Sequence, residues 1–271
     1  GTIGGGLLGT VSLGLPYVAR SLLLVAVLAA AAFWMHDLGF EPSSETGLKR
    51  RVREVVTSSI EHGWGNRPVR LLAISAFFWG GTTIWIFYAF QPYILELYGD
   101  PDAIWLAGVS AAAFSSAQIV GGALVDRMRR SFRSRTKVVA GALALAAAAI
   151  AIVGVAAWLP MRTGFWIAIA ALLATSFLYA IMEPFRGALL NDLIPARQRA
   201  TILSFDSLAS SAGGAAIQPA LGKSADVWSL GVGYLMSAGL FALSVPFVVA
   251  VRRMGLAADR VADGHRTHKR G

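Results

Sequence analysis

Apolar segments about as long as a membrane-spanning helix recur along this chain and constrain its fold more than any other feature. They lie at residues 15–35, 71–93, 104–125, 138–159, 165–185, 201–221 and 230–251. A helix needs roughly 20 apolar residues to cross a bilayer. Because 56% of the residues are hydrophobic and 14% are charged, too little polar surface remains to coat a soluble globule of 271 residues. We therefore predict an all-α protein, a polytopic bundle of transmembrane helices in a lipid bilayer.

Basic residues gather in every second connection between these segments. Arg and Lys crowd the stretches after 15–35, 104–125, 165–185 and 230–251, and the other connections hold few bases. Positively charged loops stay on the cytoplasmic side of a membrane. We therefore expect a multi-pass protein of the cell membrane with a cytoplasmic C-terminus. The same placement accounts for the net charge of +9, so we predict no nucleic-acid partner.

The first residues and the longest connection each carry a prediction. Residues 1–8 have the composition of the last turns of an apolar helix, so we expect a fragment that opens inside a membrane helix and lacks further N-terminal helices of the same chain. In the connection 36–70, apolar residues from Leu48 to Ile60 fall at helical spacing, opposite several bases. This pattern predicts a helix lying on the membrane surface, and a solvated linker is the alternative.

The segment 104–125 runs into the sequence GGALVDRMRR at 121–130. This sequence resembles the loop signature of the major facilitator superfamily, in which a glycine, a leucine and an Asp-Arg pair precede further bases. Gly122, Asp126, Arg127 and Arg130 are the residues of interest, and Arg129 stands where the signature has a second glycine. Glycine permits close helix approach, and an aspartate can lie at the N-terminus of a neighbouring helix.

The resemblance covers nearly all of the chain up to Arg253. Residues 189–201, LLNDLIPARQRAT, are similar to the loop between helices ten and eleven of drug-exporter-like members. The resemblance divides the chain into the end of an N-terminal half (1–35), a central cytoplasmic loop with an amphipathic helix (36–70), a C-terminal six-helix half (71–253) and a cytoplasmic tail (254–271).

This resemblance implies a secondary transporter that works by alternating access between two halves. The similarity to drug exporters suggests proton-coupled efflux of a small amphipathic molecule. A metabolite uptake carrier of the same superfamily is the first alternative. A membrane enzyme, an assembly factor or a sensor built on a transporter-like fold is the second.

Polar residues at helical spacing predict a substrate path through the bundle. The candidates are Trp85, Tyr88, Gln91, Ser176, Tyr179 and Gln218. For the tryptophan and the tyrosine of 71–93, an aromatic belt at the membrane interface is the alternative. Ser115 and Gln118 form a smaller polar spot, for which we expect hydrogen bonds between helices.

Charges within the membrane limits need a partner or a function. Glu183 and Arg186 lie one turn apart, and they either pair locally or join an inner-gate network, which we favour. The other members of that network would be Asp126, Arg127 and Asp192. Asp206 either carries a coupling proton or accepts hydrogen bonds in a polar cluster, and the second role is expected.

Motifs for enzymatic chemistry are not seen in the sequence. The four histidines lie in loops or the tail, away from carboxylates at metal-ligand spacing, and there is no cysteine. No phosphate-binding loop is present, so we predict neither ATP hydrolysis nor any other enzymatic activity. We expect no metal and no cofactor.

Overall fold

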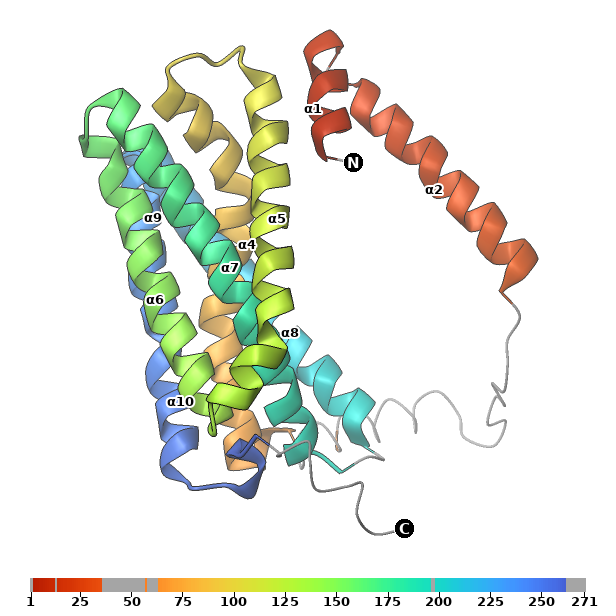
Figure 1. Ribbon diagram of the computed structural model, residues 1–271, viewed down its shortest axis with the longest axis vertical. Coiled ribbons are helices and arrows are strands. Elements are labelled where there is room, and N and C mark those ends of the chain that lie inside the picture. The colour runs from red at the N-terminus through yellow and green to blue at the C-terminus, as the bar shows by residue number, and fades with distance from the viewer. Residues whose placement is uncertain (1, 13, 36–56, 58–62, 196–197, 262–271) are drawn as a thin grey trace.

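The computed structural model describes residues 2–12, 14–35, 57, 63–195 and 198–261, and these are almost entirely helical (Figure 1). The helices are α1 (Thr2–Val11), α2 (Leu15–Trp34), α4 (Arg67–Tyr98), α5 (Ile104–Ser131), α6 (Arg135–Val155), α7 (Met161–Leu193), α8 (Arg199–Val227), α9 (Leu230–Ala242) and α10 (Ser244–Arg253), with short 3-10 turns η2 (Ala156–Trp158) and η4 (Ala257–Asp259). The all-α prediction is confirmed. The predicted amphipathic helix of the central loop lies outside the described residues.

Helices α4 to α10 form one bundle around α4. This helix packs against α8, α7, α9 and α10, while α6 packs between α7 and α9. Its core includes large side chains that are fully buried, among them Tyr93, Leu143, Ile150 and Leu221. At the N-terminal end of the described chain, α1 packs against α5, and α2 packs against α1 and lies away from the bundle (Figure 1).

Six helical stretches of the described residues are long and apolar enough to cross a membrane. They are Leu15–Trp34, Arg67–Tyr98, Ile104–Ser131, Arg135–Trp158, Met161–Leu193 and Leu230–Arg253. Each contains or closely matches one predicted segment. The remaining segment, 201–221, lies in α8, which is 29 residues long but is not one of the six. Its serines, Asp206 and Gln218 lower its apolar content. The prediction of a seventh membrane-spanning segment at 201–221 therefore treats this helix as more apolar than it is.

Prolines mark the points where the long helices are interrupted or weakened. Pro246 cannot donate a hydrogen bond to the carbonyl of Ala242, and α9 ends at that residue before α10 begins. Pro184 lies inside α7 and leaves the carbonyl of Ala180 without its usual helical donor. The single segment 230–251 is therefore two helices, and α7 has one weak point along its 33 residues.

Glycine allows α4 and α8 to approach closely. A Cβ atom added at Gly213 of α8 would lie 1.9 Å from the carbonyl oxygen of Phe77 in α4. A backbone atom cannot move away as a flexible side chain can. The two helices therefore depend on the missing Cβ for their contact.

We predict that Gly213→Ala destabilises the bundle by about 1–3 kcal/mol, because the added methyl group must push α4 and α8 apart. The midpoint of thermal unfolding in detergent should fall. Gly222→Ala is the matched control, since it lies on the same helix with no atom within 4 Å of the added Cβ. Equal unfolding midpoints for the two variants would contradict the assigned α4–α8 contact.

Candidate functional site

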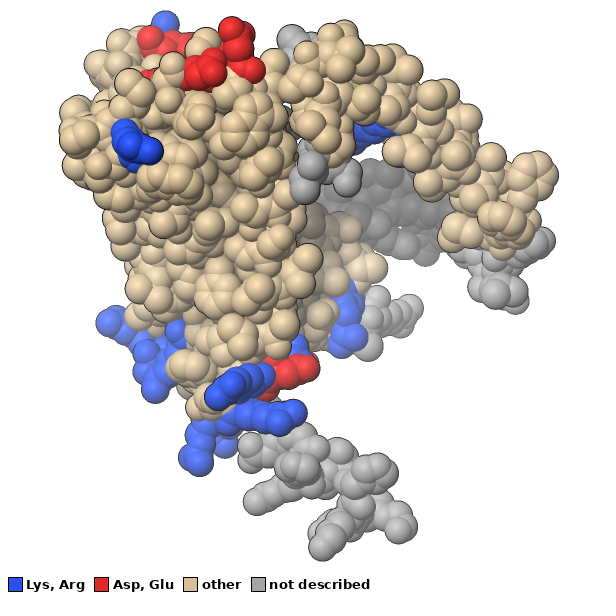
Figure 2. Space-filling view, turned by 45° about the horizontal axis from the view of Figure 1, so that its top comes forward, with Lys and Arg blue, Asp and Glu red and all other residues tan. Residues whose placement is uncertain are grey.

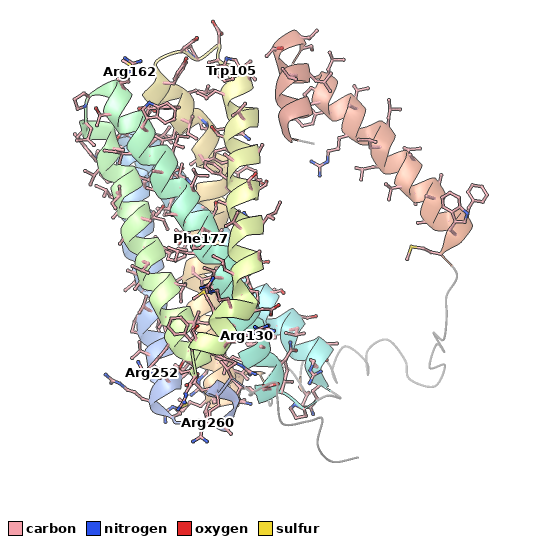
Figure 3. The ribbon with its side chains drawn as sticks, viewed as in Figure 1. Trp105, Arg130, Arg162, Phe177, Arg252 and Arg260 are labelled. Atoms are coloured by element: carbon pink, nitrogen blue, oxygen red, sulfur yellow. The ribbon has the colours of Figure 1, made fainter. Side chains whose placement is uncertain are left out.

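The bundle has a basic end and an acidic end. Lys and Arg side chains gather at one end of the surface, and Asp and Glu gather at the other (Figure 2). We call the basic end the one that carries Arg130, Arg252 and Arg260, while Trp105 and Arg162 lie at the acidic end (Figure 3). The alternation of charge along the sequence thus becomes a separation of charge along the bundle.

A cavity of about 580 Å³ lies between α4, α5, α6 and α7. Its polar lining consists of Thr83, Tyr88, Gln91, Ser115, Gln118, Thr175, Ser176 and Tyr179. Most of the other lining residues are apolar, including Phe90, Phe114, Leu172 and Met182. Among the described residues that line the cavity, none is charged. Its size falls in the range of sites for small organic molecules.

Helix α4 brings Tyr88 and Gln91 to the cavity, but not Trp85. Tyr88 is 69% exposed, whereas Trp85 is buried with its ring centroid 5.2 Å from that of Tyr234 in α9. The sequence predicts one shared face for the three residues, and this is wrong. Each three-residue step turns an α-helix by about 60° backwards, so Trp85 and Gln91 differ by about 120°.

Helix α7 contributes Ser176 and Tyr179, two of the residues proposed for the substrate path, and also Thr175. The hydroxyl of Thr175 donates to the carbonyl of Ala171 at 2.9 Å, which leaves its methyl group and a lone pair for the cavity. Spacing could have selected Thr175, because it lies four residues before Tyr179 and so shares a face of the helix with it. Its place follows from the packing of α7 against α6 and α5.

Helix α5 lines the opposite wall through Ser115 and Gln118. Ser115 donates to the carbonyl of Ala111 within its own helix at 2.9 Å, and both side chains are exposed. The sequence predicts that they hold helices together. Their place at the cavity instead adds a hydroxyl and an amide to the polar lining.

Gln218 of α8 does not line the cavity. It is half-buried, and its Nε2 lies 3.1 Å from the point where a Cβ of Gly214 would stand. Helix α8 packs on α4, and among the described residues none of α8 lines the cavity. The sequence groups Gln218 with the substrate path because polarity alone does not show which neighbour a helix face meets.

A buried ion pair links α7 and α8. Arg186 Nη2 donates to Asp206 Oδ1, and the two residues are 4% and 8% exposed. The same Nη2 lies 3.5 Å from the carbonyl oxygen of Leu72 in α4, and the guanidinium carbon lies 5.3 Å from the ring centroid of Trp79. One arginine of α7 therefore contacts two other helices, α8 through its charge and α4 through a carbonyl and an aromatic face.

This pair is not among the alternatives that the sequence offers for Arg186. Those alternatives are a local pair with Glu183 or a network at the inner gate. Glu183 is half-buried on the next turn, whereas Asp206 is buried and needs a counter-charge more strongly. The arginine therefore pairs with the carboxylate of α8.

The remaining gate candidates lie at the basic end but do not form one network with Arg186. Asp192 pairs with Arg135 at 2.5 Å, and Asp126 lies 3.8 Å from Arg129 with its side chain 81% exposed. Arg127 and Arg130 are exposed. These charges form separate contacts at the ends of α5, α6 and α7.

Gly121, rather than Gly122, provides the close helix contact in the signature sequence. A Cβ added at Gly121 would lie 2.7 Å from the carbonyl oxygen of Phe177 in α7, whereas nothing lies within 4 Å of one at Gly122. The sequence predicts this role for Gly122. The two adjacent glycines face directions about 100° apart, and α7 lies on the side of the first.

The comparisons with known proteins agree with this architecture. The family model of the Major Facilitator Superfamily matches residues 1–217, a span that includes the helices α4 to α7 of the cavity and both members of the buried ion pair. A comparison with curated proteins gives no significant match. The match covers more than half of the 271 residues. The chain therefore belongs to the major facilitator superfamily, a family of membrane transporters.

Proposed function

We propose that this transporter exports a small amphipathic molecule in exchange for protons. The cavity between α4, α5, α6 and α7 is the observation that carries the proposal. It combines apolar walls with hydroxyl and amide groups, and the described lining residues include no charge. Such a lining favours ligands with an aromatic or aliphatic body and a few hydrogen-bonding groups. In alternating access, two halves rock about a central site, to which the C-terminal half would contribute this cavity.

The orientation proposed for the chain follows from its charges. The basic end carries many Arg and Lys residues, and such residues are held on the cytoplasmic side of membranes (Figure 2). With this end inside the cell, the C-terminus is cytoplasmic and the acidic end faces outward. The membrane in this proposal is the cell membrane.

Glu183 is the carboxylate that we assign to proton coupling. Asp206 is already engaged by Arg186 in the buried ion pair between α7 and α8. Glu183 is half-buried, one turn along α7 from Tyr179 at the cavity and one turn from Arg186. A proton on Glu183 would change the charge between the substrate site and the ion pair. The drug-exporter-like resemblance supports exchange as the mode of coupling.

Reconstitution of the full-length protein in proteoliposomes tests this function. An imposed pH gradient should drive aromatic amphipathic dyes against their concentration gradient. Movement of a hydrophilic metabolite down the proton gradient, with no dye transport, would support the uptake carrier instead. Failure to move any compound in a folded, monodisperse preparation would support a membrane protein without a transport cycle.

We predict that Tyr88→Ala weakens dye binding by up to about tenfold, because an exposed aromatic ring at the cavity is lost. Trp85→Ala is the matched comparison on the same helix. It should lower the unfolding midpoint through the lost contact with Tyr234 and alter affinity less. Quenching of dye fluorescence measures the affinity. The assignment of the two faces fails if Trp85→Ala weakens binding more than Tyr88→Ala.

A further inference from the structure

The residues after α10 turn back across the basic end of the bundle and pair with the segment between α5 and α6 (Figure 1). Ser134 and Arg260 form an antiparallel bridge, and Val261 N donates to the carbonyl of Arg133 at 3.2 Å. The sequence predicts a cytoplasmic tail over 254–271. Its first part is packed against the bundle rather than extended into solvent.

Asp259 of this returning segment caps helix α6. Its Oδ1 accepts a hydrogen bond from the backbone N–H of Thr136 at 2.7 Å, and its Oδ2 accepts one from Ser134 Oγ at 2.9 Å. Ser134 in turn accepts a hydrogen bond from Lys137 N at 3.2 Å. A carboxylate at a helix N-terminus satisfies free N–H groups and interacts favourably with the helix dipole. The cap is supplied from a residue 123 positions later in the chain.

Arg135 connects the same segment to α7. It donates to the carbonyl of Ala258 at 3.0 Å, to the carbonyl of Ala188 at 3.2 Å and to the carboxylate of Asp192 at 2.5 Å. The Arg135 side chain is 12% exposed. One arginine at the start of α6 therefore holds the returning segment and the last turns of α7 at the same time.

Pro184 lies within α7, just before the last turns that Arg135 contacts through Ala188 and Asp192. A proline inside a helix removes one backbone hydrogen bond and is a common point of bending. Beyond it lie Arg186, Ala188 and Asp192, while Ser176 and Tyr179 at the cavity lie before it. A bend at Pro184 would move the basic end of α7 relative to the cavity. The contacts of Arg135 oppose that bend.

We propose that residues 257–261 form a latch that holds the part of α7 beyond Pro184 against α6 and opens when the basic end of the transporter opens. Asp259 and Arg135 are its positioning residues. The proposal rests on the proposed function, because a transport cycle is what requires this end to open. The latch places the C-terminal segment in the gating of the cycle.

A thiol introduced by Ala188→Cys reports whether the latch is closed. Ala188 lines a cavity of about 200 Å³ together with Arg129, Arg135, Phe185 and Val261. The 271 residues contain no cysteine, so the substitution gives them a single thiol. With Asp259→Ala in the same chain, a water-soluble maleimide should label the thiol about tenfold faster, because hydrogen bonds to a charged group are lost.

Controls separate latch opening from general loosening. Asp259→Glu should restore slow labelling, and Asp102→Asn, which removes an exposed carboxylate from the acidic end, should leave it unchanged. A second reporter, Ser237→Cys, is fully buried in α9 and should stay unlabelled in every variant. The proposal is overturned if Asp259→Ala leaves labelling at position 188 unchanged, or if it exposes position 237 equally. Labelling needs no substrate, so a failed transport assay does not affect this result.

Discussion

Arg186→Ala should destabilise the bundle by about 3–5 kcal/mol, because it leaves the carboxylate of Asp206 buried without a counter-charge. It also removes the contact with the ring of Trp79 and the approach to the carbonyl of Leu72. Thermal unfolding in detergent, followed by tryptophan fluorescence or by binding of a thiol-independent dye, measures the loss. Arg162→Ala is the matched control, since Arg162 is exposed at the acidic end.

A double replacement tests whether the loss comes from the unpaired charge. Arg186→Met combined with Asp206→Leu removes both charges and keeps similar side-chain volume. Replacing a buried ion pair by apolar residues is often neutral or stabilising, so the double variant should recover much of the stability lost in Arg186→Ala. Stability as low as that of the single variant would mean that the arginine acts through its other contacts.

The membrane helices could be predicted from the sequence because length and apolar content are properties of one continuous segment and do not depend on its neighbours in the fold. Six of the seven predicted segments match helices that meet the criteria for crossing a membrane. Segment 201–221 is a helix too, and it packs closely against α4, but its serines, Asp206 and Gln218 keep it from meeting those criteria. The break at Leu243 followed from Pro246, which a hydropathy count ignores.

The candidate site could be predicted only in part, because spacing along one helix does not identify the helices that surround it. Tyr88, Gln91, Ser176 and Tyr179 come together at the cavity. Trp85 turns toward Tyr234 because repeated three-residue steps drift around the helix.

Contacts between distant segments were the hardest to predict. The partner of Arg186 lies 20 residues away on α8, and the partners of Asp259 lie more than 120 residues away at α6. Each of these carboxylates has several basic or polar candidates nearby in sequence. The three-dimensional arrangement of helix ends selects among them.

Glu183→Gln should uncouple transport from the pH gradient while leaving exchange of substrate at equal pH intact. Glutamine has the size and the neutral charge of protonated glutamate, so the variant remains in one charge state throughout the cycle. Coupling between two ligands is typically a 5–150-fold effect, and gradient-driven accumulation should fall by about that factor. Dye accumulation and dye exchange in the same proteoliposomes measure the two activities. Glu96→Gln, which removes an exposed carboxylate near the acidic end of α4, should affect neither.

The comparison with Asp206→Asn decides which carboxylate carries the proton. If Glu183 carries it, Asp206→Asn weakens the ion pair with Arg186 and lowers stability, yet the protein that remains folded still responds to the pH gradient. If Asp206 carries it, the result reverses: Asp206→Asn loses coupling with exchange intact, and Glu183→Gln keeps it. Because Arg186 lies within one turn of Glu183 and binds Asp206, a proton on Glu183 changes the electrostatic environment of the pair that joins α7 to α8. Charge movement at one residue can thereby alter the contact between two helices, which is the physical requirement for coupling a proton to a conformational change.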